Sequence, residues 1–159
     1  TPVRKMEFLL GKQLPYIVVS LISFFGLVTF AIYVFQVPLK GSLFTLTLGV
    51  FLYIICTTAI GLFISSFAKT QIAALMGTAI LTLLPTIQFS GLKEPVSSLE
   101  GVAQYIGNIF PVTYFINISR GVFSKNVSFS ELRFEFFVLS ISIFVILYCS
   151  YLVLNKQEK

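Results

Sequence analysis

Four long hydrophobic runs, separated by shorter polar stretches, dominate the pattern of this sequence. A helix rises about 1.5 Å per residue, so about 20 apolar residues cross a hydrocarbon layer about 30 Å thick. The four runs therefore predict an all-α membrane protein. We expect its transmembrane helices at residues 14–36, 43–68, 70–91 and 136–154.

Lys69 is the single charged residue between Gly41 and Gly91. A lysine in the middle of a bilayer costs roughly 2.5–3.5 kcal/mol, whereas a lysine among the headgroups costs little. We therefore expect a turn at residues 67–71, lying at one membrane surface.

The first thirteen residues mix charged with apolar side chains and are too short to span. Their apolar positions recur at spacings of three and four residues, as on one face of a helix: Val3, Met6, Leu9 and Leu10. The pattern predicts an amphipathic cytoplasmic helix at residues 1–13, with an N-cap at Thr1 before Pro2. Two interpretations stay open: a helix lying on the headgroups, or a docking helix for a cytoplasmic partner.

The segment before the last run is apolar but interrupted. Ser97 to Glu100 matches a capping box that would open one short helix, Pro111 would end it, and a second would follow at residues 113–123. Each helix is too short to span alone and too apolar for a free loop. We expect a re-entrant or interface-lying helix pair at residues 96–124.

Small residues four positions apart occur in both middle runs, as Thr57 with Gly61 and as Ala73 with Gly77. Small side chains let helix backbones approach closely in lipid. Both pairs therefore predict helix contact faces.

Polar residues recur along the third run at Thr78, Thr82, Thr86 and Gln88, close to Pro85. Threonine hydroxyls in helices commonly bond back to carbonyls of their own helix. The alternative is a polar strip lining a substrate path.

The composition excludes an ordinary soluble domain, because 57% of the 159 residues are hydrophobic and 11% are charged. The net charge of +5 comes from scattered Lys and Arg with no basic stripe, which indicates interface anchors and no nucleic-acid partner.

The chain contains no His and no Asp, which excludes Ser-His-Asp and Cys-His nucleophile systems and histidine metal sites. Cys56 and Cys149 lie inside apolar runs and are interpreted as small buried residues without a disulfide. No Gly-x-x-x-x-Gly-Lys-Ser/Thr phosphate loop is present. We therefore predict no catalytic residue, metal or cofactor in this chain.

The distribution of Lys and Arg sets the expected orientation. Six lie on the side of the two termini and the Lys69 turn, against five on the other side. We expect both ends of the segment in the cytoplasm.

Several stretches, in their order and spacing, resemble the membrane domain of ABC-2 type exporters. They are the opening TPVRKMEFLLGKQLPY, GLFISSFAKTQIAALMG around Lys69, PTIQFSG, PVSSLEG, FPVTYF and RGVFSK. They look most similar to permeases of bacterial drug and small-molecule efflux systems and to the membrane part of ribosome-associated ATPase type fused transporters. The resemblance implies a domain of six spanning helices, of which this chain would supply the last four. The start at Thr-Pro-Val without an initiator Met fits a piece of a longer polypeptide.

The resemblance also implies partners in a bacterial inner membrane: an ATPase that binds ATP and Mg, a second permease half, and a periplasmic adaptor. The family's coupling element would fall on the first residues, with contacts from Arg4, Lys5, Met6, Glu7, Leu9 and Leu10. The helix pair would act as the outer gate through Pro111 and Tyr114, and the cargo would be small or amphipathic compounds.

Three rival functions stay open. An ion-coupled carrier usually has ionisable residues within its spans, which these runs lack, although a sodium-driven carrier could use Thr and carbonyl oxygens. An intramembrane enzyme would need a base near a nucleophile, and none stands at helical spacing within a run. A passive anchor for a larger ATPase is the third.

Overall fold

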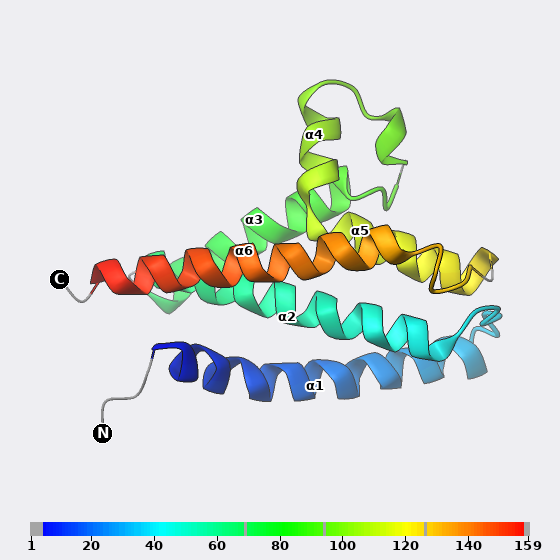
Figure 1. Cartoon of the computed structure of the whole chain (residues 1–159), viewed down its shortest axis with the longest axis horizontal. Helices are drawn as coiled ribbons and strands as arrows, with labels where there is room; N and C mark the ends of the chain where they lie inside the picture. The colour runs from blue at the N-terminus through cyan, green and yellow to red at the C-terminus, as the bar shows by residue number, and fades with distance from the viewer. Residues whose placement is uncertain (1–4, 69, 94, 126, 158–159) are drawn as a thin grey trace.

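The computed structural model describes residues 5–68, 70–93, 95–125 and 127–157, and every regular element among them is helical (Figure 1). The four long helices are α1 Lys5–Tyr33, α2 Leu43–Phe67, α3 Gln71–Phe89 and α6 Arg133–Gln157. Between α3 and α6 lie the short elements η1 Val96–Ser98, α4 Val102–Ile109, α5 Pro111–Arg120 and the π-helical turn η2 Gly121–Lys125.

Each long helix contains a stretch that is long and apolar enough to cross a membrane, which confirms the prediction of four candidate spans. These stretches are Gly11–Tyr33, Leu43–Phe67, Gln71–Phe89 and Arg133–Val153.

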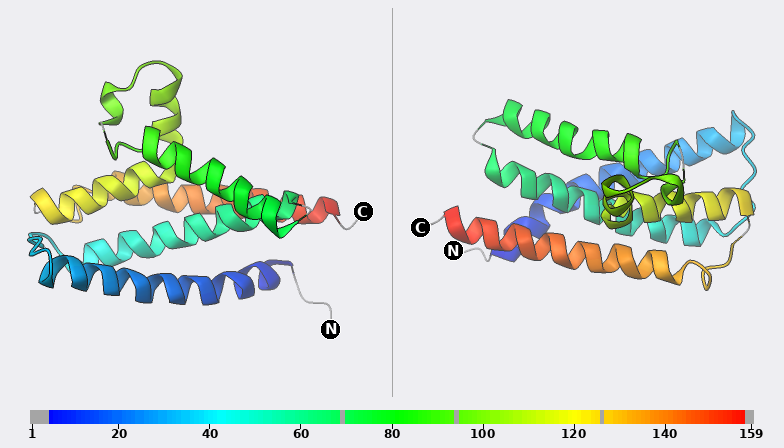
Figure 2. Two further views of the ribbon diagram at one scale, coloured as in Figure 1. Left: turned by 180° about the vertical axis from the view of Figure 1, so that it is seen from behind. Right: turned by 90° about the horizontal axis from the view of Figure 1, so that it is seen from above.

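The first turn of α1 and the last turn of α6 lie at the same end of the bundle, together with the connection between α2 and α3 (Figures 1 and 2). Residues 34–42 and 127–132 lie at the opposite end. The long helices therefore alternate in direction, as four successive crossings require. Lys69 itself is outside the described residues.

The amphipathic helix expected at residues 1–13 is not confirmed as a separate element. Its described part, residues 5–13, forms the first turns of α1 and continues without a break through Pro15. A proline removes one backbone hydrogen bond, a loss that a long apolar helix tolerates when its other bonds persist. The expected cap at Thr1 and Pro2 lies outside the described residues.

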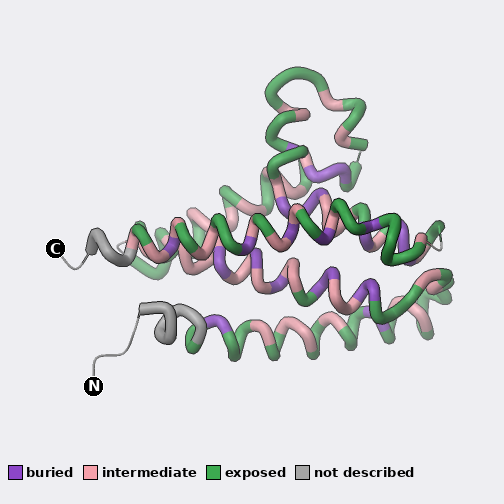
Figure 3. Tube along the Cα trace, in the orientation of Figure 1, coloured by how far each residue is buried: buried purple, intermediate pink, exposed green. Residues whose placement is uncertain are grey.

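α2 is the central helix, with contacts to α1, α3, α5 and α6. The main hydrophobic cluster lies toward the end of the bundle that holds residues 34–42 and 127–132, and Figure 3 shows buried segments there and farther along the helices. It consists of Val28, Leu46, Ile118, Val122, Leu132, Phe136 and Leu139. The cluster thus joins α1, α2, α5, η2 and α6 at that end, whereas α3 has no buried residue along its described length.

The capping box predicted at Ser97 to Glu100 is wrong. Ser97, the predicted N-cap, lies inside η1, and residues 99 and 100 that follow this turn are not helical. α4 begins at Val102, directly after Gly101, whose φ of 59° is a conformation that favours glycine. The break predicted at Pro111 is confirmed, because Pro111 is the first residue of α5.

Candidate functional site at the junction of α4 and α5

The junction between α4 and α5 joins two helices of different direction. α4 stands across the direction of the long helices, whereas α5 runs alongside α6 (Figures 1 and 2). Phe110 between them has an extended backbone, with φ −77° and ψ 124°, and Pro111 then restarts the helix. Two short helices thus lie at this position, whereas their placement as a re-entrant or interface-lying pair stays a prediction.

Two side chains of α5 fasten the end of α4. The hydroxyl of Thr113 donates to the carbonyl of Gly107 at 2.6 Å, and the hydroxyl of Tyr114 donates to the carbonyl of Asn108 at 2.5 Å. The last carbonyls of a helix have no partner within the helix, so these bonds satisfy groups that would otherwise be unpaired. These side-chain to backbone bonds therefore hold the end of α4 against α5, and the two helices together are called the hairpin below.

A glycine places α4 against the end of α3. A β-carbon added at Gly107 would collide with the carbonyl oxygen of Phe89 and would come 2.8 Å from Cγ1 of Val96. Any side chain at Gly107 would meet the backbone of Phe89, which cannot turn aside as a flexible side chain can. Only glycine therefore permits α4 to pass so close to the end of α3.

α5 is anchored on α2 by two contacts. The rings of Tyr53 and Phe115 stack with centroids 4.5 Å apart and planes 9° from parallel. One helical turn away, a β-carbon at Gly49 would come 2.9 Å from Cγ2 of the fully buried Ile118. α5 is thus the part of the hairpin that belongs to the core.

An apolar cavity of about 530 Å³ lies on one side of the junction, between α2, α3 and α6. The junction contributes Ile109, Phe110 and Pro111 to its wall. The other helices contribute Ile60, Phe63, Ile64, Leu81, Ile141, Ser142, Val145, Ile146 and Cys149.

A second, polar pocket of about 350 Å³ lies beside α5, and Asn108, Thr113 and Tyr114 of the same junction contribute to its wall. The remaining lining residues are Gly91, Pro95, Val96, Ser97, Asn117, Arg120, Phe134 and Glu135. Neighbouring residues of one short segment therefore line two spaces of opposite polarity.

Two charged side chains lie in this polar pocket. Nη2 of Arg120 donates to the carbonyl of Leu92 at 3.1 Å, which ties α5 to the segment after α3. Oε2 of Glu135 is buried and has no hydrogen-bond partner among the described residues. Burial and the nearby charge of Glu135 raise the pKa of Tyr114 above its ordinary value.

The predicted gate residues Pro111 and Tyr114 thus lie at the junction and line the two cavities. The polar strip of α3 is half-buried at Thr78, Thr82 and Thr86 and exposed at Gln88. The hydroxyl of Thr82 donates to the carbonyl of Thr78 at 2.6 Å, as the back-bonding interpretation expects. In the apolar cavity α3 contributes Leu81.

The small-residue pairs predicted as contact faces behave differently from each other. Gly61 has no other atom within 4 Å of its β-carbon position. Gly77 faces Ile64 of α2 at an ordinary 3.6 Å. The close approaches occur instead at Gly41, Gly49 and Gly107, which the four-residue spacing did not identify.

The predicted coupling residues Lys5, Met6, Glu7, Leu9 and Leu10 are helical in α1, but their side chains lie outside what the structure describes, as does Arg4 entirely. Farther along α1, the side chain of Gln13 is buried and its amide donates to the hydroxyl of Thr58 on α2 at 3.3 Å. α1 is therefore joined to α2 by a polar contact as well as by apolar packing.

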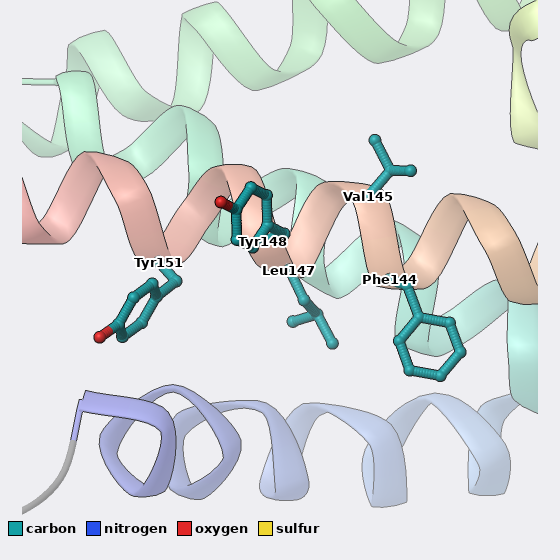
Figure 4. Close-up of a pocket in the computed structure, with 5 residues that line it drawn as sticks. All are labelled: Phe144, Val145, Leu147, Tyr148 and Tyr151. Carbon is teal, nitrogen blue, oxygen red and sulfur yellow. The ribbon is translucent and has the colours of Figure 1, made fainter.

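A third hollow, of about 660 Å³, follows α6 and is lined by Phe144, Val145, Leu147, Tyr148 and Tyr151. Figure 4 shows Phe144, Leu147 and Tyr151 pointing from α6 toward α1. The lining is apolar apart from two tyrosine hydroxyls, so the hollow suits lipid or a further apolar helix and offers no reactive group.

Glu135 and Arg120 were not identified as site residues from the sequence. The available signal for Glu135 was a carboxyl group close to Arg133 in the first turn of a helix whose middle is uncharged. Within the described residues, no group of three His, Cys, Asp or Glu side chains could hold a metal ion.

Comparison with known proteins gives a consistent result. Residues 1–153 match the model of a family described as ABC-2 family transporter protein. The chain is 27% identical over 128 residues to the probable multidrug ABC transporter permease YbhR of Escherichia coli, which covers 80% of this chain and 34% of that protein. It is 30% identical over 141 residues to the inner membrane transport permease YhhJ of Escherichia coli, covering 87% and 37%.

A eukaryotic relative, ABC transporter G family member 20 of Dictyostelium discoideum, is 26% identical over 159 residues, covering 99% of this chain and 22% of that protein. The chain thus spans about a third of the length of the bacterial relatives and less of the eukaryotic one. No solved structure matches.

Proposed function

This chain belongs to the ABC-2 family of transporter proteins, and from that membership we propose that it is the membrane permease portion of an ATP-driven exporter. Its cargo would be small molecules or amphipathic compounds. YbhR carries the name of a probable multidrug ABC transporter permease, which supports this class of cargo.

The energy would come from a partner, because the sequence contains no phosphate-binding loop. An ATPase domain, fused or separate, would bind ATP and Mg and push on the start of α1. Arg4, Lys5 and Glu7 would supply polar contacts there, and Met6, Leu9 and Leu10 the apolar anchor. The continuity of α1 supports this coupling, since a displacement of its first turns is carried along an unbroken helix.

The observation that carries the transport hypothesis is the position of the α4 and α5 junction between an apolar cavity and a polar pocket. We place the outer gate there, at Pro111 and Tyr114. Opening the junction would connect a space suited to an apolar molecule with a space suited to a hydrated one. Thr78, Thr82, Thr86 and Gln88 would line the path inside the membrane.

The complete transporter would contain a second permease half, either a copy of this chain or a different one, and a periplasmic adaptor on the outer side. We propose that the segment lies in a bacterial inner membrane with both ends in the cytoplasm. The exposed apolar surface of α3 supports contact with lipid or with a second half.

The test is transport in inverted membrane vesicles that contain the full-length protein and its ATPase. We expect ATP-dependent uptake of radiolabelled tetraphenylphosphonium, lost when the phosphate-loop lysine of the ATPase is replaced. Uptake that persists without ATP but collapses with the sodium gradient would establish the carrier instead. ATPase-dependent activity that survives deletion of the whole membrane segment would establish the anchor.

A further inference from the structure

The apolar cavity beside the α4 and α5 junction is an elongated space along the membrane-spanning helices. Its sides come from α2, and from α3 and α6, which both pack on α2. The residues that α6 contributes begin at Ile141 and end at Cys149. On the other side of the junction α5 packs against α2 and α6, so Phe110 and Pro111 form one end of the cavity.

The wall of the cavity offers no free polar group to a ligand. None of its described residues carries a charge, and the hydroxyl of Ser142 already donates to the carbonyl of Val138 at 2.8 Å. The last carbonyls of α4 accept bonds from side chains of α5. An occupant would therefore be held by van der Waals contact with apolar side chains, as apolar surfaces are held together inside a bilayer.

The cavity is continuous with the surface that faces lipid. Leu81 of α3 and Ile141 and Val145 of α6 line the cavity and are also exposed, on helices that are long and apolar enough to cross the membrane. A molecule dissolved in the bilayer can therefore enter from the side without passing through water.

The dimensions of the cavity favour a hydrocarbon chain over a further helix. From Ile141 to Cys149 α6 rises about 12 Å, close to the hydrocarbon thickness of one leaflet, which is about 15 Å. A helix of that length, about 10 Å across, would need about 900 Å³. The cavity holds about 530 Å³. One extended hydrocarbon chain, a single methylene group wide, fits this space along its whole length.

We propose that the apolar cavity binds the hydrocarbon chain of a single-chain amphiphile, whose polar head stays outside the cavity. The inference rests on the proposed function, because it takes the amphiphile to be cargo and both termini to be cytoplasmic. The cavity then lies on the cytoplasmic side of the junction, since its α6 wall comes from the half of α6 nearer the C-terminus. Cargo from the inner leaflet would be held there by its chain until the junction opens.

Photolabelling without ATP tests the site. The full-length protein, in complex with its ATPase, is placed in nanodiscs of phosphatidylcholine that contain a trace of palmitic acid with a diazirine group in the middle of its chain. Ultraviolet light attaches this probe to nearby residues, and mass spectrometry of the peptides identifies them. We expect label on the wall residues of α2 and α6, and an excess of ordinary palmitic acid should reduce this label several-fold.

Filling the cavity should have the same effect as competition. Ile141→Trp places a bulky ring where the chain would lie, and it should reduce the label several-fold because the two cannot occupy one volume. Leu152→Trp is the matched control. Leu152 lies on the same helix and is 47% exposed against 45% for Ile141, but it does not line the cavity. The label in this variant should equal that of the natural protein.

Label that excess palmitic acid does not reduce, or that is equal in the Ile141→Trp variant, would overturn the proposal. A second probe, phosphatidylcholine with a diazirine in one chain, separates cargo from bilayer lipid. If it labels the same residues and palmitic acid does not displace it, the cavity holds ordinary membrane lipid and the proposal is wrong. Saturable labelling without ATP-driven uptake would refute export and keep the site, whereas uptake without such labelling would refute the site and keep export.

Discussion

Gly107 of α4 packs directly against the backbone carbonyl of Phe89 at the end of α3. The contact places the hairpin relative to the third span without any side chain between the two backbones. It explains why a short helix can stand across the bundle: α4 is held by α3 at Gly107 and by α5 through Thr113 and Tyr114.

Replacing Gly107 by alanine should destabilise the hairpin. The added methyl group meets backbone that cannot turn aside, and overpacking of this kind costs about 1–3 kcal/mol, more than the helix propensity that alanine gains. We expect a lower unfolding temperature for the purified full-length protein. Gly61→Ala is the control, because that helical glycine faces open space and its replacement should leave the temperature unchanged or raise it.

Gly49 and Ile118 should be energetically coupled. Gly49→Ala places a methyl group 2.9 Å from Cγ2 of Ile118, which should cost about 1–3 kcal/mol. In the Ile118→Ala background the obstructing atoms are gone, so the same change should cost much less. A double-mutant cycle on the unfolding free energy measures the difference. Additive effects would contradict the close approach, and Gly77→Ala, with its ordinary 3.6 Å contact, should be near neutral.

Removing the hydroxyl of Tyr114 should loosen the junction. Tyr114→Phe deletes the bond to the carbonyl of Asn108, a net loss of about 0.5–1.5 kcal/mol that corresponds to roughly two- to tenfold more frequent opening. Hydrogen exchange of the α4 amides, followed by mass spectrometry, should accelerate by that factor. Tyr105, an exposed residue of α4, provides the control, and Tyr105→Phe should leave the exchange rate of the α4 amides unchanged.

The coupling hypothesis predicts a specific loss at the start of α1. Met6→Asp should abolish stimulation of the partner ATPase by the permease while the protein still inserts into the membrane, because a charge replaces part of the apolar anchor. Phe8→Asp makes the same change on the opposite side of the helix by the 3.6-residue period and should retain most of the stimulation. If both variants lose the stimulation of the ATPase, or if both keep it, the assignment of the Met6 side of the helix as the docking face is wrong.

The spans could be predicted from the sequence because apolar length is a property of each segment alone. The helix pair before α6 and its break at Pro111 followed from local signals in the same way. The exact start of α4 did not follow from the sequence, because Ser97 lies inside the turn η1 and Gly101 adopts a positive φ before the helix begins. A capping motif cannot show which of these alternatives the chain takes.

The polar pocket could not be predicted because its wall joins segments that are distant in the sequence, from Gly91 through Arg120 to Glu135. The same holds for Gln13, which finds Thr58 on another helix, 45 residues away. The predicted gate residues Pro111 and Tyr114 came from the resemblance to the family, whereas the bonds that Thr113 and Tyr114 donate to α4 appeared only in the structure.

The hydrophobic cluster at one end of the bundle has a mechanical consequence. At that end the amide of Gly41, between α1 and α2, also donates to the carbonyl of Val122 at 2.8 Å, which links the first helical hairpin to η2. If α1 tilts, this end of the bundle is therefore the fixed point of the rotation. The first turns of α1 would move over the longest distance. The residues near the fixed point, where α5 and η2 are attached, would move over a short distance under a larger force.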